Sequence, residues 1–378
     1  LLLVKLHNRL FRQKDYLEKK IEINRQELQA IAYDTSAFDN GKEFIDPAHL
    51  YTYDLDVFGE HSLFQYINRT ATQPGKKRLA EWMNTHLKNK AEIEGYRSAM
   101  LKDGVAMVKF LKWLKPAVEA GGQTEISIDE KLTSLRAEQK LFRDISFDTI
   151  AGYAQHGAIV HYEATPETDV VLKPEGLILI DSGAQYQDGT TDITRTIALG
   201  PVSEEMKHVY TLVLKAHIQL ELVKFPDGAS GTQLDAVGRE CMWREGYNFL
   251  HGTGHGVGSY LCVHEGPHQI RMEWMPTPLR AGMTLTDEPG LYLTGKFGVR
   301  IENTVLISDY MSTEFGKFLQ IEPLTLCPID TTPIDVDMLL PEEIDWLNAY
   351  HHSVYEKLSP FLDEEEKIWL ENATKPIK

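Results

Sequence analysis

Leu177-Ile-Leu-Ile-Asp-Ser-Gly183 is the stretch from which the fold of this chain is predicted. It is followed by Thr190-Thr-Asp-Ile-Thr-Arg-Thr196. The apolar run before Asp181 predicts a buried strand, and the alternation after Asp192 predicts a second strand. These two aspartates lie eleven residues apart and are joined through glycines. That spacing suits a hairpin, which would return the second carboxylate to the site of the first.

The same arrangement recurs downstream. Glu288 stands in Asp-Glu-Pro-Gly and Glu302 in Arg-Ile-Glu-Asn, fourteen residues apart with turn-forming residues between them. His255 lies in a separate glycine-rich segment, His251-Gly-Thr-Gly-His-Gly-Val-Gly258. Carboxylates can bridge two ions, so four of them and one imidazole can hold two divalent cations and leave positions open for water and substrate.

Each of these residues has an ordinary alternative role when taken singly. An aspartate after a strand is more often a turn former or a helix cap, and Glu-Pro-Gly is usually a turn. A lone histidine is more often a hydrogen-bonded polar side chain than a ligand. The order Asp, Asp, His, Glu, Glu at these spacings makes the metal site the better interpretation, because the coincidences multiply.

Composition limits the classes of protein to consider. The chain has 378 residues, 42% hydrophobic and 25% charged, which is ordinary for a soluble globular protein. A net charge of −17 argues against binding nucleic acid through the overall field. Residues 1–90 carry 14 Lys/Arg against 12 Asp/Glu, whereas the rest carries 25 against 44, which indicates two unlike parts.

The cysteines and the first residues indicate a compartment. Cys241, Cys262 and Cys327 are far apart and form no CxxC pair, so we expect a reducing compartment and no disulfide framework. The opening Leu-Leu-Leu-Val is too short for a signal sequence or a membrane span. We therefore expect a cytoplasmic protein that does not act at a membrane.

Hydrophobic periodicity predicts an α+β protein preceded by a mostly helical segment. We expect helices at 1–32, 61–68, 75–87, 91–114 (ended by Pro116), 128–139 (capped by Ser127), 203–225, 234–245, 341–358 and 364–372. We expect strands at 145–150, 157–161, 177–181, 192–199, 283–288, 298–307 and 321–326, and a short strand or turn at 51–57. The alternation of strands with long helices indicates a curved mixed sheet with helices on its outer face.

Residues 1–90 resemble an internal segment of MutS-like mismatch-repair proteins. The residues that carry the resemblance are Leu55-Asp-Val-Phe-Gly-Glu-His-Ser-Leu-Phe-Gln-Tyr-Ile-Asn-Arg-Thr70 and Gly75-Lys-Lys-Arg-Leu-Ala80. The ATPase motif of that family is missing, because Gly75-Lys76 lacks the earlier glycine and the following Ser/Thr of a P-loop. We interpret these basic residues as a solvated helix face rather than a DNA contact.

From about residue 91 to the C-terminus the chain resembles the pita-bread metallopeptidases, and within them the long, three-domain type of aminopeptidase P. The match includes the motifs quoted above and continues through Gly157-Ala-Ile-Val-His-Tyr162, Val263-His-Glu-Gly-Pro267, Glu322-Pro-Leu-Thr-Leu-Cys-Pro328 and Glu343-Ile-Asp-Trp-Leu-Asn348. It implies a catalytic domain at 91–318 and a C-terminal extension at 319–378. The family's own N-terminal domains are replaced by residues 1–90, so the chain looks chimeric.

The resemblance implies a ligand set and a mechanism. Asp181, Asp192, His255, Glu288 and Glu302 would bind two divalent ions, with Asp192 and Glu302 bridging. Mn²⁺ suits this carboxylate-rich set, with Co²⁺ or Zn²⁺ as alternatives. A metal-bridging hydroxide would attack the carbonyl before a proline nitrogen, and Glu288 would carry its proton to the leaving nitrogen.

Further family positions are filled. His161 would hold substrate from its strand, His264 would stabilise the tetrahedral intermediate, and His251 would lie near the proline pocket. Arg300 would orient carboxylates through a bidentate hydrogen bond. Each of the three histidines could instead support the site or the core without touching substrate.

The function expected from this resemblance is an Xaa-Pro aminopeptidase that acts on peptides with proline at the second position. One alternative is a prolidase acting on Xaa-Pro dipeptides, and another is a non-catalytic pita-bread module that binds peptides. A DNA-repair scaffold function in residues 1–90 is the weakest alternative. The sequence leaves a homodimer open.

Overall fold

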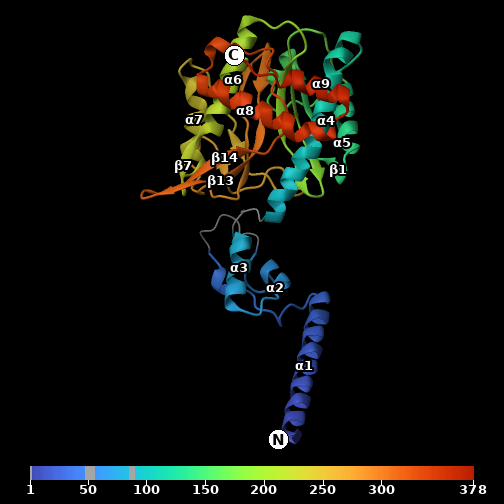
Figure 1. Cartoon of the computed structure of the whole chain (residues 1–378), viewed down its shortest axis with the longest axis vertical. Coiled ribbons are helices and arrows are strands. Elements are labelled where there is room, and N and C mark those ends of the chain that lie inside the picture. The colour runs from blue at the N-terminus through green and yellow to red at the C-terminus, as the bar shows by residue number, and fades with distance from the viewer. Residues whose placement is uncertain (1, 47–55, 85–89) are drawn as a thin grey trace. The chain divides into compact units, whose positions relative to one another are not determined.

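The computed structural model describes residues 2–46, 56–84 and 90–378, and it divides into two compact units, residues 1–86 and 87–378 (Figure 1). In the first unit, α1 (Leu2–Ile31) is one helix, and its apolar Leu10 and Leu17 side chains are exposed. The 51–57 strand or turn lies largely outside the described residues.

The rest of the first unit is built around a few aromatic side chains. It contains the short helix η1 (Lys42–Phe44), α2 (Leu63–Ile67) and α3 (Gln73–Asn84). Phe44, Phe58 and Phe64 contact one another, with ring centroids 5.2–5.8 Å apart. Ser62 caps α2 by accepting from the backbone N–H of Gln65. This is a small local core, consistent with the short helices around it.

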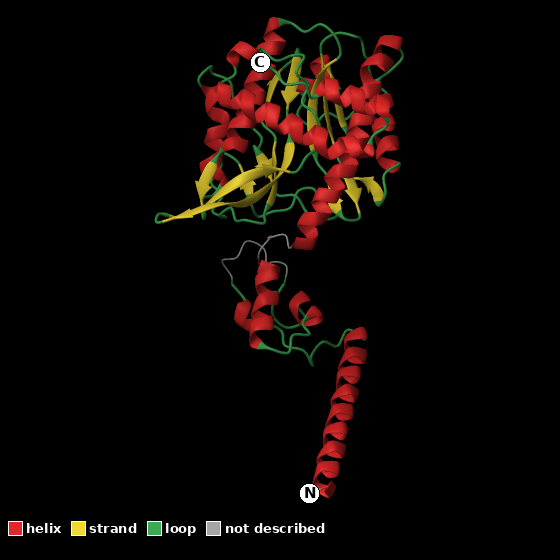
Figure 2. Cartoon of the chain, in the orientation of Figure 1, coloured by secondary structure: helices red, strands yellow, loops and turns green. Residues whose placement is uncertain are grey.

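Two larger sheets organise the second unit (Figure 2). One has the order β2–β3–β6, formed by Ile150–Tyr153, Leu177–Ser182 and Ile193–Ala198. The other has the order β10–β13–β14–β7, formed by Thr284–Asp287, Asn303–Thr313, Gly316–Pro323 and Lys224–Pro226. Every strand pair among the described residues is antiparallel.

Shorter strands form three further sheets among the described residues. They are β1 (Phe142–Ile145), β4 (Ala184–Tyr186), β5 (Gly189–Thr190), β8 (Gly254–His255), β9 (Gln269–Ile270), β11 (Gly290–Leu293) and β12 (Phe297–Arg300). The β4–β5 and β11–β12 hairpins stand between the two members of each acidic pair. Each connection therefore turns back, as the spacing of the pairs predicts.

Long helices cover these sheets (Figures 1 and 2). They are α4 (Lys90–Ala120), α5 (Glu125–Ala137), α6 (Glu204–Leu222), α7 (Gly231–Trp243), α8 (Pro341–Leu358) and α9 (Glu364–Ala373). Figure 1 shows α4 and α5 on one side of the unit and α6 and α7 on the other. None of the helices that the structure describes is long and apolar enough to cross a membrane.

Several expected boundaries are wrong. The strand expected at 145–150 is absent, because β1 ends where it should begin and β2 starts at its last residue. Residues 154–158 form the 3₁₀ helix η2 instead of starting a strand at 157. The expected strand at residues 157–161 was too short for periodicity to distinguish a strand from a helical turn.

Other differences concern where helices and strands end. The α4 helix continues past Pro116 to Ala120, and Gly121, with φ +85°, follows it. Thr124, not Ser127, caps α5, and the two side chains form a capping box. The strand expected at 298–307 is interrupted, because β12 ends at Arg300 and β13 begins at Asn303. This break frees Glu302 from the regular pleat.

Candidate metal centre

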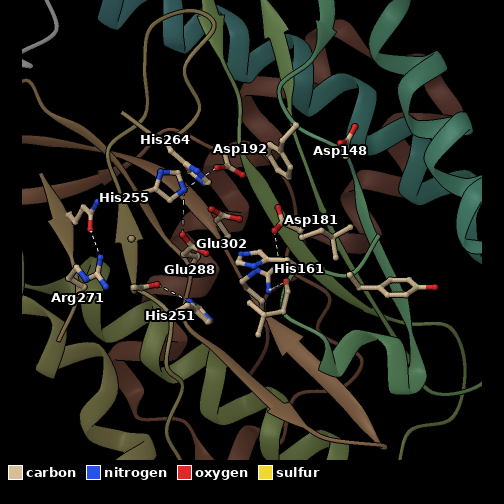
Figure 3. Close-up of a pocket in the computed structure, with 18 of the residues that line it drawn as sticks. Asp148, His161, Asp181, Asp192, His251, His255, His264, Arg271, Glu288 and Glu302 are labelled. Atoms are coloured by element: carbon tan, nitrogen blue, oxygen red, sulfur yellow. Dashed lines mark hydrogen bonds and ion pairs between the residues drawn. The ribbon is translucent and has the colours of Figure 1, made fainter. Parts of the chain in front are cut away.

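A cavity of about 510 Å³ brings the predicted site residues together (Figure 3). Its lining includes all five predicted ligands, the three predicted substrate histidines and the predicted orienting arginine: Asp181, Asp192, His255, Glu288, Glu302, His161, His251, His264 and Arg300. These residues come from segments spread over about 140 positions of the chain. Their convergence is produced by the tertiary fold.

The two aspartates reach the cavity from the β3–β6 pair. Asp181 lies near the end of β3 and pairs with Thr194, while Asp192 directly precedes β6. One carboxylate oxygen of Asp181 accepts from Arg300 Nη2 at 2.5 Å, and the other is buried without a hydrogen-bond partner. Burying an oxygen in this way is costly unless a ligand satisfies it.

The two glutamates reach the cavity from the β10–β13 pair. Glu288 directly follows β10, and Glu302 directly precedes β13. Glu288 Oε1 accepts from Thr286 Oγ1 at 3.1 Å, and Glu302 Oε2 accepts from Thr194 Oγ1 at 2.6 Å. Each carboxylate is thus oriented by one hydroxyl group and keeps further lone pairs for a cation.

His255 presents one ring nitrogen to the acidic side chains. Its Nδ1–H donates to the Gly256 carbonyl at 3.0 Å, which leaves Nε2 facing Asp192 at 3.4 Å and Glu288 at 3.5 Å. Ligand atoms of Asp192, His255 and Glu302 all lie within 4.8 Å of one another. Fixing one nitrogen with a backbone carbonyl is the usual way in which a protein directs the other nitrogen at a metal.

The electrostatics of the cavity favour positive charge. Burial raises the pKa of Asp192 and Glu302, and raises that of Glu288 to about 7. Burial lowers the pKa of His255, but its hydrogen bond to Asp192 and the charge of Glu288 outweigh this and raise that pKa to about 9. Together with the unpartnered oxygen of Asp181, this donor set fits divalent cations.

A hydrogen-bonded chain supports one side of the cavity. Arg300 Nη1 donates to the Tyr292 hydroxyl at 2.6 Å, and that hydroxyl lies 2.9 Å from His251 Nε2. His251 Nδ1 donates to the Gly252 carbonyl, so Nε2 accepts from Tyr292. Arg300 binds Asp181 through one nitrogen, and its Nε donates to Thr194, so the expected bidentate hydrogen bond is wrong.

The remaining predicted histidines lie at the mouth of the cavity. His161 is exposed and follows η2, so its expected position on a strand is wrong. His264 is also exposed, and its ring lies edge-on to that of His255, with centroids 4.2 Å apart. Desolvation and the nearby charge of His255 lower the pKa of His264. Figure 3 shows His161 near Asp181 and His264 near His255.

Sequence reasoning missed several residues of the site. Thr194, Thr286 and Tyr292 orient carboxylates or the arginine. Thr194 and Thr286 lie two residues from a ligand, so the alternation of side chains along a strand could have indicated them. Asp148 and Arg271 line the cavity from loops, and nothing in their local sequence marks them.

Comparison with known proteins agrees with this geometry. Metallopeptidase family M24 matches residues 94–309, and the C-terminal region of peptidase M24 matches residues 317–377. Aminopeptidase P1 of Arabidopsis thaliana is 43% identical over 77% of this chain and 49% of its own length. Xaa-Pro aminopeptidase 1 of Dictyostelium discoideum is 41% identical, with 77% and 48% covered.

Solved structures show the same fold. The X-prolyl aminopeptidase of Caenorhabditis elegans, described as a cytosolic enzyme with a di-nuclear active site, aligns with a TM-score of 0.73 at 40% identity, covering 77% of this chain and 49% of that one. The prolidase of Pyrococcus horikoshii aligns with a TM-score of 0.55 at 30% identity, with 67% of each chain covered.

The extent of these matches bears on both parts of the chain. The chain spans about half the length of the curated relatives it matches. The family matches lie within residues 94–377 and give the MutS-like resemblance of residues 1–90 no support, so it stays a prediction.

The pita-bread fold expected for the larger part is confirmed. By its family match and by the convergence of the acidic residues and His255, the chain belongs to metallopeptidase family M24.

Proposed function

We propose that residues 87–378 hydrolyse the peptide bond between an N-terminal residue and a following proline. The observation that carries this proposal is the gathering of five metal-binding side chains and three histidines around one cavity. The names of the relatives supply the reaction class, since several are Xaa-Pro aminopeptidases. A peptide with proline at its second position is therefore the proposed substrate.

Two divalent cations, with Mn²⁺ as the favoured metal, would be held by Asp181, Asp192, His255, Glu288 and Glu302. Asp192 and Glu302 are the proposed shared ligands, as the family resemblance implies, because each carboxylate offers two oxygen atoms. When bound, such cations lower the pKa of water and polarise the scissile carbonyl.

Glu288 is the proposed proton carrier. Its carboxylate lines the cavity beside the other proposed ligands, where it would take a proton from the attacking water and give it to the leaving proline nitrogen. Thr286 fixes one oxygen of this carboxylate at 3.1 Å, which limits its rotation. The proton therefore travels on a side chain whose position changes little between the two steps.

The histidines are assigned to substrate contacts. His264 lies beside His255, and its lowered pKa leaves it a neutral donor for the oxygen that gains charge in the tetrahedral intermediate. His161 is placed at the mouth of the cavity to hold the peptide, and His251 is placed near the proline ring. Phe147, Ile150 and other apolar lining residues suit an apolar pyrrolidine ring.

The proposal extends to the organisation of the chain. We assign the catalytic domain to residues 91–318 and the C-terminal extension to residues 319–378. Residues 1–90 are proposed to be a segment of different origin, which the separate compact unit at residues 1–86 supports. Cytoplasmic location and a homodimer are further proposals, the former supported by the description of the Caenorhabditis elegans enzyme as cytosolic.

A prolidase is the second candidate function. The structure of the Pyrococcus horikoshii prolidase covers this chain at a lower identity than the aminopeptidase does. Residues 317–377 match the C-terminal region of peptidase M24, and the resemblance of this extension to the long type of aminopeptidase P favours the aminopeptidase. A non-catalytic peptide-binding module is disfavoured by the complete set of metal-binding side chains.

Release of the N-terminal residue from an Xaa-Pro-Pro peptide tests the proposal. The protein is supplied with Mn²⁺ and compared on an Xaa-Ala-Ala peptide and an Xaa-Pro dipeptide. Cleavage of the proline tripeptide alone is the expected result. Cleavage confined to the dipeptide would establish a prolidase, and no cleavage by a metal-loaded sample would support the binding module.

A further inference from the structure

A second group of ionisable side chains lies behind the metal centre, in the core. Helix α6 carries His217 and Glu221, which face Asp287 on β10 and Asn303 on β13. His217, Asp287 and Asn303 are fully buried, and Glu221 is 2% exposed. This cluster takes no part in the mechanism proposed above, yet burying two carboxyl groups is costly. A structural role for the cluster would account for this free-energy cost.

The hydrogen bonds of the cluster fix the orientation of Asn303. Arg195 Nη2 donates to Asn303 Oδ1 at 2.9 Å, so this atom is the amide oxygen. The amide nitrogen of Asn303 must then face the other way, where it lies 2.8 Å from Glu221 Oε1 and 3.2 Å from His217 Nε2. Both of those atoms are consequently acceptors.

The orientation of Asn303 in turn fixes the proton of His217. Because Nε2 accepts from the amide, the ring proton is on Nδ1, which lies 3.1 Å from Asp287 Oδ2 in a close polar contact that lacks hydrogen-bond geometry. Burial lowers the pKa of His217 to about 4, in keeping with a neutral ring. The imidazole therefore links Asn303 to Asp287 with one defined tautomer.

Each end of this link is the chain neighbour of a proposed metal ligand. Asp287 directly precedes Glu288 and Asn303 directly follows Glu302, and the two residues pair across β10 and β13. Glu288 and Glu302, which flank the two strands, line the cavity, whereas Asp287 contacts His217 and Asn303 contacts Glu221 on α6. The ligands accordingly face the cavity while Asp287 and Asn303 face α6.

We propose that His217 is a positioning residue: by binding Asp287 and Asn303 on two paired strands, it sets the separation of Glu288 and Glu302 and thereby the affinity for the second metal ion. This inference rests on the proposed two-metal function. An apolar contact would hold the strands together with less directional control, whereas one rigid ring that hydrogen-bonds Asn303 and lies 3.1 Å from Asp287 restrains both strands at once. The free energy that burying the two carboxyl groups costs is the consequence of holding the two strands in fixed positions.

Mn²⁺ titration by calorimetry of the whole chain, together with the electron paramagnetic resonance signal of the Mn²⁺ pair, tests the role of His217. Three variants are compared with the unmodified protein. His217→Gln can place an amide oxygen close to the position of Nε2, where it accepts from Asn303, while His217→Leu has a similar size and no acceptor. His351→Leu is the matched control, because His351 is equally buried but bonds the backbone of Ile329, away from the site.

We expect His217→Leu to bind the weaker of the two ions about 10- to 100-fold less tightly, with an altered spin-coupled signal. His217→Gln should stay within a fewfold of the unmodified protein. His351→Leu should lose thermal stability without changing either metal affinity. This pattern would show that metal affinity depends on the position of the ligands and not on stability alone, since both leucine variants lose a buried hydrogen bond.

Equal metal affinities for His217→Leu and the unmodified protein would overturn the inference. A third bound ion that disappears with His217→Leu would also overturn it, because the cluster would then be a metal site itself. If His217→Leu does not fold, Asp287→Asn gives the same test, and unchanged affinity there would likewise refute the role. Absence of Mn²⁺ uptake by the unmodified protein would instead refute the proposed metal centre.

Discussion

The two strand pairs that supply the acidic residues both present carboxylates to the cavity. The side chains on their opposite faces differ in polarity. In the β3–β6 pair, the neighbours of Asp181 and Asp192 are Ile180 and Ile193, which pack into an apolar cluster with α4 and α5. In the β10–β13 pair, the corresponding neighbours are Asp287 and Asn303, which face His217 and Glu221 on α6. One half of the centre has an apolar support and the other a polar one.

The two supports stabilise similar carboxylate side chains through different forces. The apolar support contributes stability roughly in proportion to buried area and has little directional preference. The polar support contributes little net stability, because desolvation offsets most of the hydrogen-bond energy, but it specifies positions. Substitutions in the two halves should therefore separate stability from metal binding.

The largest effect is expected from removing a ligand in either half. Asp192→Asn and Glu302→Gln each take away a proposed bridging carboxylate while keeping its size. We expect each to lose most metal uptake and to lower turnover of the Xaa-Pro-Pro peptide at least about a thousandfold, about 4 kcal/mol in the barrier. Metal content and kcat/KM check this, and normal turnover by a metal-verified sample of either variant would contradict the shared ligand set.

The next effect concerns the apolar support. Ile180 is 1% exposed, so Ile180→Ala should lower the free energy of unfolding by about 2–5 kcal/mol through lost burial and a cavity. Mn²⁺ affinity should change less than in His217→Leu, because no hydrogen bond to a ligand's neighbour is lost. Denaturant unfolding and Mn²⁺ titration measure the two quantities. A loss of Mn²⁺ affinity as large as that of His217→Leu would show that the apolar and the polar support affect metal binding equally.

The polar support should make stability depend on pH. Burial raises the pKa of Glu221 to about 7, so the folded state holds a proton that the unfolded chain, with a pKa of 4.5, releases earlier. Its contribution to stability is full below pH 4.5 and is lost as the pH rises through about 7. Between pH 5 and 8 the metal-free protein should lose about 2 kcal/mol more stability than Glu221→Gln.

Unfolding curves of the two proteins at several pH values measure this difference. Glutamine imitates the protonated side chain, so the other titrating groups cancel in the comparison. Ile180→Ala, which removes no titratable group, serves as the control and should keep the pH dependence of the unmodified protein. Parallel pH profiles for the unmodified protein and Glu221→Gln would show that Glu221 is ionised in both states.

The smallest effect is expected where the two halves meet. Tyr292 joins His251 to Arg300, which binds Asp181. Tyr292→Phe removes one hydroxyl from this chain and should lower kcat/KM about five- to tenfold, equivalent to about 1 kcal/mol. Tyr310→Phe, at a half-exposed position on β13, is the control and should leave kcat/KM unchanged. Equal values for all three proteins would show that the chain does not contribute to catalysis.

Local sequence patterns were enough to predict which residues could form the candidate metal centre and which acidic residues are paired. Apolar runs next to Asp181 and Glu288, with glycines and turns at hairpin spacing, were sufficient to predict that each acidic pair returns to one place. Helices with long periodic patterns, such as α6 and α8, were also predicted within a few residues. These features depend on interactions between residues close in the chain, which a local pattern records.

The tertiary structure alone decided what orients those residues. The partners of Arg300, the tautomer of His217 and the placement of His161 after η2 depend on segments far apart in the sequence. The local sequence Thr-Asp-Glu-Pro-Gly indicates that Asp287 is another turn-forming acid, and only the packing of α6 against β10 and β13 brings His217 within 3.1 Å of it. A hydrogen bond depends on distance and direction in space, so a pattern along one chain cannot specify it.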